Sequence, residues 1–205
     1  MKKLSGHLQY HWWQYLVYTI VVIFLWCTVF QVLAQPANHE AIRILFVGEY
    51  WDTQALADEI HTHLQQTTAQ PISAVEIDIE AQKTDQLLPI LIAKQYYYDL
   101  IIVSEPWMQE NIGQNAFGLP IPDQITEGHP AWDYYTELLE QTAYPFAVAL
   151  YKGTESNHFS AHYTGSENCY LFLSNQSVNC DQLNGQGQPG YDAAIKTLEY
   201  LLEKP

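Results

Sequence analysis

Two short polar stretches, each directly after an apolar run, carry the residues of this sequence that could do chemistry. The first stretch supplies Glu49, Tyr50, Trp51 and Asp52, and the second supplies Ser104, Glu105 and Trp107. Paired carboxylates can act as general acid and base or hold a cation, and indole rings stack on sugars or cations. If both stretches line one cleft, the sequence predicts a ligand site. The alternative is that both tryptophans pack in the core and the acids are solvated.

The elements around these stretches follow the succession of an α/β domain. The first apolar run, with ILFV at 44–47, suits a parallel strand that is buried on both faces, and Gly48 allows a sharp turn beneath the next helix. The patterns predict strands at 42–47, 75–80, 99–104, 145–151 and 170–173, and helices at 53–66, 85–95, 132–142 and about 194–202.

The strand patterns also predict an order for the sheet. Residues 75–80 alternate apolar and acidic, as an edge strand does, whereas 42–47 and 99–104 are continuously apolar. This fits a three-layer, doubly wound parallel sheet in the order 2-1-3-4-5. The first and third strands are then neighbours, so the two polar stretches meet at one crevice. The long segment 105–131 is predicted to be a loop that folds over it.

In strand order and in two short motifs the chain resembles the SGNH or GDSL-like hydrolases, which share a flavodoxin-like topology. Gly48-Glu49-Tyr50 stands where that family has Gly-Asp-Ser, and Asp181-Gln182-Leu183-Asn184 stands where it has Asp-x-x-His before the last helix. The resemblance implies the doubly wound α/β fold of that family. Because Tyr50 replaces the nucleophile and Asn184 replaces the base, it also implies a member that is inactive as an esterase.

The N-terminus reads as a membrane segment. Residues 1–14 contain Lys2 and Lys3. Residues 15–34 carry no charge, and this stretch is about as long as a transmembrane helix. We expect residues 1–14 in the cytoplasm, 15–34 as a transmembrane anchor, 35–41 as a linker and 42–205 as an exported domain. Small residues ending at Ala34 leave a cleaved signal peptide open as the alternative, in which case the domain is secreted.

Charge and cysteine content restrict the partners. The chain after residue 35 has 6 basic and 23 acidic residues, so its net charge is 6 − 23 = −17. This disfavours nucleic acid as a partner. No cofactor is predicted, because GxGxxG is absent. No metal is predicted either, since His158 and His162 fall in a loop-like segment. In an exported domain Cys169 and Cys180 are expected to form a disulfide.

The sequence leaves three functions open. We expect first a non-enzymatic binding or accessory module at the cell envelope, periplasmic or extracellular, with a glycan or small molecule as ligand. The second is a hydrolase with an unconventional site at the ends of the first and third strands. The third is an interaction subunit of a membrane complex that makes contact through its N-terminal helix.

Overall fold

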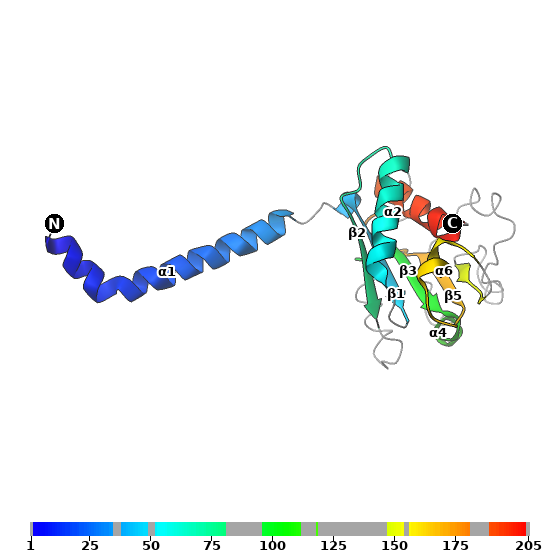
Figure 1. Cartoon of the computed structure of the whole chain (residues 1–205), viewed down its shortest axis with the longest axis horizontal. Helices are drawn as coiled ribbons and strands as arrows, with labels where there is room; N and C mark the ends of the chain where they lie inside the picture. Colours follow the sequence, from blue (N-terminus) through cyan, green and yellow to red (C-terminus); the bar gives the residue numbers. More distant parts are fainter. Residues whose placement is uncertain are drawn as a thin grey trace. The chain divides into compact units, whose positions relative to one another are not determined.

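The computed structural model describes residues 2–34, 38–48, 52–80, 96–111, 118, 147–153, 156–180 and 189–203. The chain divides into two compact units, Met1–Pro36 and Ala37–Pro205. The first unit contains the helix α1 (Lys2–Ala34), and the second is an α/β domain (Figure 1).

The helix α1 contains one stretch that is long and apolar enough to cross a membrane. This stretch is Trp12–Phe30, 19 residues, and none of it is buried against protein. The hydroxyls of Thr19 and Thr28 donate hydrogen bonds of 2.8 Å to the carbonyls of Tyr15 and Phe24, which satisfies both groups in an apolar surrounding. The predicted N-terminal apolar helix is therefore confirmed, and its length and composition suit a membrane anchor or a signal sequence.

The domain alternates strands and helices. Its helical elements are η1 (Asn38–Glu40), α2 (Thr53–Thr67), α4 (Glu105–Asn111), α6 (His158–His162) and α7 (Pro189–Leu202). Its strands are β1 (Ala41–Val47), β2 (Ala74–Glu80), β3 (Leu100–Ser104), β4 (Val148–Tyr151) and β5 (Cys169–Leu173). As predicted, β1 and β3 are buried throughout and β2 is half-exposed.

The five strands form one mixed sheet in the order β2-β1-β3-β5-β4. β1 pairs in parallel with β2 and β3, but β5 lies antiparallel between β3 and β4. The all-parallel order 2-1-3-4-5 is thus correct for three strands and wrong for the last two. The last residue of β4 pairs with the first residue of β5, Tyr151 with Cys169, so the connection 152–168 begins and ends at the same end of the sheet. β5 therefore runs back antiparallel to both β4 and β3.

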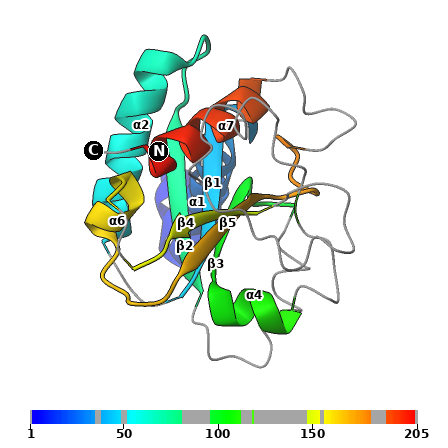
Figure 2. The ribbon, with the colours of Figure 1, turned by 90° about the vertical axis from the view of Figure 1, so that its right-hand side faces the viewer.

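Both faces of the sheet are buried. α2, α6 and α7 lie on one face, where they enclose the even-numbered side chains of β1, including Ile44 and Phe46 (Figure 2). On the other face Leu45 and Val47 pack with Trp107. α4 is the one helix on this second face in the part of the chain that the structure describes, so a three-layer fold stays a prediction.

Two local predictions were wrong. The predicted loop 105–131 begins as the helix α4, which starts with Glu105 in its first turn. The predicted loop around His158 is the helix α6, because Asn157 forms a capping box with Ser160. The predicted helices 85–95 and 132–142 lie outside the described residues, as does nearly all of the remainder of the predicted loop.

Candidate functional site

A small polar pocket lies at the predicted crevice, where β1 and β3 end. It has a volume of about 50 Å³ and is lined by Phe46, Val47, Gly48, Ser104, Tyr163, Gly165, Ser166, Glu167 and Cys169. A water molecule occupies about 30 Å³ of liquid, so the pocket admits one hydroxyl, amine or water-sized group. Within the described residues, the site can therefore hold the tip of a ligand.

The antiparallel direction of β5 determines which side chains line this pocket. In the register of β3 with β5, Ser104 is opposite Cys169, so the first residue of β5 lies beside the last residue of β3. Sequence reasoning missed Cys169, Tyr163 and Glu167, because a parallel β5 would place its start at the other end of the sheet. The sequence carries no signal for the direction of β5, because its apolar run suits a parallel or an antiparallel neighbour equally well.

The thiol in the pocket is not set up as a nucleophile. Burial raises the pKa of Cys169 to about 12, and a hydrogen bond with Tyr163 opposes this rise only in part. The Cys169 Sγ lies 3.6 Å from the carbonyl oxygen of Glu167, to which the thiol can donate. A neutral thiol at pH 7 is a poor nucleophile. No histidine lines the pocket among the described residues, and Glu167 is the carboxylate in the described lining.

Gly48 contributes to the pocket by its lack of a side chain. A Cβ built on Gly48 would come within 2.6 Å of the Phe46 ring, which is closer than carbon atoms approach. The Gly48 amide donates a 3.1 Å hydrogen bond to the Glu80 carbonyl, which fixes the strand exit against β2. The need for glycine here arises from close packing.

The predicted site residues have separate roles in the structure. Asp52 caps the N-terminus of α2 and accepts a hydrogen bond from the Ala55 amide at 3.3 Å, which is a structural task. Glu105 accepts a 2.6 Å hydrogen bond from the Asn168 side chain, so the carboxylate is held beside the start of β5. Ser104 lines the pocket.

Trp107 does not line the pocket. Its side chain is only 6% exposed and belongs to the core cluster on the second face of the sheet, with Val103 and Met108. An indole in this position stabilises the domain and is not available for stacking on a ligand. The other predicted site residues, Glu49, Tyr50 and Trp51, lie outside the described residues.

The predicted disulfide is absent, since Cys169 and Cys180 are both buried free thiols. Cys169 is opposite Ser104 at one end of β3, whereas the Cys180 Sγ lies 3.9 Å from the Asp99 carbonyl oxygen just before the other end. Four to five strand residues separate these ends, which is about 15 Å. A disulfide requires Cα atoms within about 7 Å, so the two cysteines cannot be joined in this fold.

The two histidines of α6 face different partners. The His158 ring stacks on Tyr200 with 4.1 Å between centroids, and the His162 Nε2 lies 3.0 Å from a Glu59 carboxylate oxygen. No group of three or more metal-ligating side chains occurs among the described residues. These histidines hold α6 against α2 and α7.

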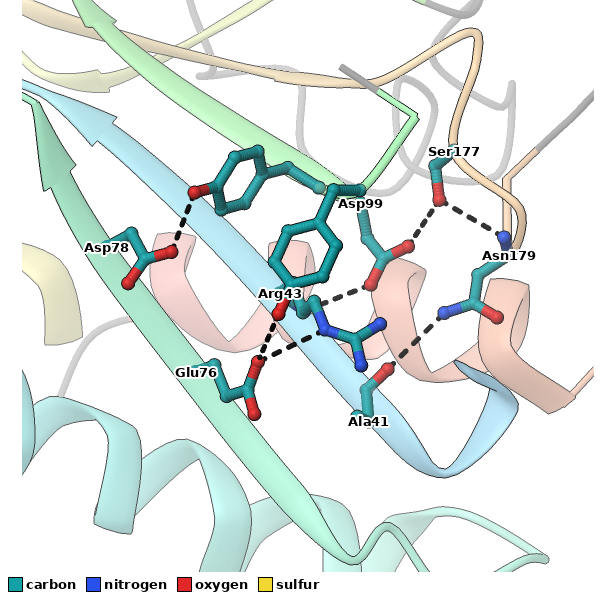
Figure 3. A network of polar contacts seen from close by, with 9 residues as sticks. Ala41, Arg43, Glu76, Asp78, Asp99, Ser177 and Asn179 are labelled. Atoms are coloured by element: carbon teal, nitrogen blue, oxygen red, sulfur yellow. Dashed lines mark hydrogen bonds and ion pairs between the residues drawn. The ribbon is translucent and has the colours of Figure 1, made fainter. Parts of the chain in front are cut away.

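A second polar cluster lies at the opposite end of the sheet, where β1 and β3 begin (Figure 3). The Asp99 carboxylate is 1% exposed and accepts hydrogen bonds from the Arg43 amide at 2.9 Å and from the Ser177 hydroxyl. The Arg43 Nε donates to Glu76 at 3.1 Å. Burial raises the pKa of Asp99, and its hydrogen bonds with Ser177 and Arg43 oppose this rise.

Comparison with known proteins adds no relative: no protein-family model, curated protein or solved structure matches this chain.

Proposed function

We propose that this chain is a cell-envelope protein whose α/β domain works as a binding or accessory module outside the cytoplasm. One observation carries the proposal: an exposed, charge-free helical stretch, Trp12–Phe30, separates Lys2 and Lys3 from an acidic domain. Lysines before such a stretch favour a cytoplasmic N-terminus. The domain is then exported, held by α1 as an anchor or released by cleavage after Ala34.

The crevice supports binding better than catalysis. Its described lining offers a hydroxyl at Ser104, a phenol at Tyr163 and a protonated thiol at Cys169, with Glu105 fixed nearby by Asn168. These groups donate and accept hydrogen bonds, which suits a glycan or another small polar ligand that enters by one polar tip. A hydrolase would need an activated nucleophile beside a base.

The topological part of the proposal is tested by a reporter fused after Pro205. The fusion should be active when the reporter requires export, and inactive when the reporter requires the cytoplasm. Activity in the cytoplasm would refute the proposal. The intact mass of the purified protein then distinguishes an anchored chain from a secreted one, because cleavage after Ala34 removes the first 34 residues.

The functional part is tested by screening the full chain for glycan binding and for ester and glycan hydrolysis. In a binding module, Glu105→Gln should weaken binding by up to about tenfold, since it replaces a charged hydrogen bond by a neutral one. The control is Glu110→Gln on the exposed side of the same helix, which should have no effect. Turnover that is lost in the Glu105 variant while binding survives would favour the hydrolase instead.

A further inference from the structure

The exposed large hydrophobic side chains of the described domain gather at one place. They are Tyr96, Tyr97 and Val178, with exposed fractions of 60%, 43% and 59%. All three line one polar pocket of about 100 Å³, together with Arg43, Asp99, Ser177 and Asn179. We call Tyr96, Tyr97 and Val178 the edge patch, since they lie at the end of the sheet where β1 and β3 begin.

Polar contacts hold Tyr97 and the two neighbours of Val178 in place. The Tyr97 ring lies 4.5 Å from the Arg43 guanidinium carbon, and its hydroxyl donates to Glu76 at 3.3 Å. Val178 stands between Ser177, which donates to the buried Asp99, and Asn179, whose side chain donates to the carbonyl of Ala41. Its exposure is therefore a property of an ordered surface.

The edge patch adjoins the point where the chain enters the domain from α1. The side chain of Asn179, next to Val178, donates a 3.3 Å hydrogen bond to the carbonyl of Ala41, the first residue of β1. Only six residues separate Ala34, the last residue of α1, from Ala41. A chain of that length spans at most about 25 Å, so Ala41 and the patch beside it are joined to α1 by a short tether.

We propose that the edge patch is a membrane-contact surface that rests on lipid headgroups. This inference depends on the proposed function, in the form in which α1 stays as a membrane anchor. Tyrosine suits this location, because its ring is apolar and its hydroxyl stays in contact with water and headgroups. The short tether keeps the local concentration of lipid high, so a small surface is sufficient.

Charge identifies the kind of lipid surface. The chain after residue 35 carries a net charge of 6 − 23 = −17, which repels anionic headgroups. The edge patch itself is uncharged. The contact should therefore form on a neutral surface such as phosphatidylcholine, and should weaken when an anionic lipid is added.

The test uses the full chain in phosphatidylcholine vesicles that contain a headgroup-linked quencher. An environment-sensitive fluorophore is attached to Val178→Cys or, in a second variant, to Tyr96→Cys, with Cys27 replaced by serine. The matched control is Ser166→Cys, which is exposed beside β5 at the opposite end of the sheet. Quenching should be several-fold stronger at positions 178 and 96 than at position 166, and should fall when phosphatidylglycerol is included.

The outcomes separate the inference from the proposed function. A chain that floats with the vesicles but shows equal quenching at 178, 96 and 166 overturns the membrane contact and leaves the anchored module intact. A chain that does not float, or whose mass shows the loss of residues 1–34, overturns both the anchor and the membrane contact.

Discussion

Asp99 offers the sharpest test of the forces that hold the sheet together. Its carboxylate is almost fully buried and accepts hydrogen bonds from the backbone amide of Arg43 on β1 and from the hydroxyl of Ser177 after β5. Its backbone amide and carbonyl also pair with Arg43 and Ser174. One residue thus connects three neighbouring elements, and its removal should destabilise the domain.

The expected cost follows from the groups that Asp99 leaves behind. In Asp99→Ala the Arg43 amide and the Ser177 hydroxyl lose their acceptor while they stay buried, and each unsatisfied group costs about 1–3 kcal/mol. The hydroxyl can rotate toward another acceptor, and removal of a buried charge is favourable, so we expect a net loss of about 2–4 kcal/mol. Asp99→Asn keeps an acceptor for Arg43 and should stay within about 1.5 kcal/mol of the native chain.

The pH dependence of stability has a defined sign. Burial raises the pKa of Asp99, so the folded domain binds this proton more tightly than the unfolded chain does. The contribution of Asp99 to stability is therefore greatest at low pH, and is lost as pH rises from the unfolded pKa of about 4 through the higher folded pKa. Asn does not titrate, so Asp99→Asn should gain stability relative to the native chain as pH rises.

The assay is urea unfolding of the full chain in mild detergent, followed by tryptophan fluorescence at several pH values. With a slope of about 2 kcal/mol per molar urea, Asp99→Ala should lower the midpoint by about 1–2 M. Asp78→Asn is the control, because Asp78 is exposed and accepts one hydrogen bond from Tyr98. A native midpoint in Asp99→Ala, or a pH profile of Asp99→Asn parallel to the native one, would refute the reasoning.

Two further predictions follow from the packing. Gly48→Ala should destabilise the domain by about 1–3 kcal/mol, because the new methyl group overlaps the Phe46 ring. Phe46→Leu should reduce the cost of Gly48→Ala in a double-mutant cycle, and simple additivity would contradict the proposed overlap. Thiol labelling without reductant should leave Cys169 and Cys180 unmodified in the native chain and modify both after unfolding. Failure of both to react after unfolding would show that they form a disulfide.

The parts of the fold that the sequence predicted are those with a local cause. The continuous apolar run of β1 predicts burial on both faces, and every residue of β1 is buried. Helical spacing of Leu56, Ile60 and Leu64 predicts α2, and these side chains face the core. Alternation in β2 predicts an edge strand, and β2 is at the edge. Each pattern depends on the environment of one element alone.

Apart from the two short helices α4 and α6, which were predicted as loops, the errors concern long-range arrangement. A strand pattern at 170–173 carries no direction, so the apolar CYLFL of β5 fits a parallel or an antiparallel neighbour equally well. The disulfide prediction failed for the same reason. Two cysteines eleven positions apart can lie side by side in a hairpin or, as here, at opposite ends of one strand. Trp107 was placed in the crevice by its position after β3, but the turn of α4 directs its side chain to the core.

The reversal of β5 accounts for both surfaces to which we assign a role. At its first residue, Cys169 meets Ser104 and closes the crevice where β1 and β3 end. Beyond its last residue, the chain passes Asp99 and brings Val178 beside the start of β1. A parallel β5 would exchange these ends and leave neither surface in place. The crevice therefore lies at the end of the sheet opposite to Ala41, the first residue of β1.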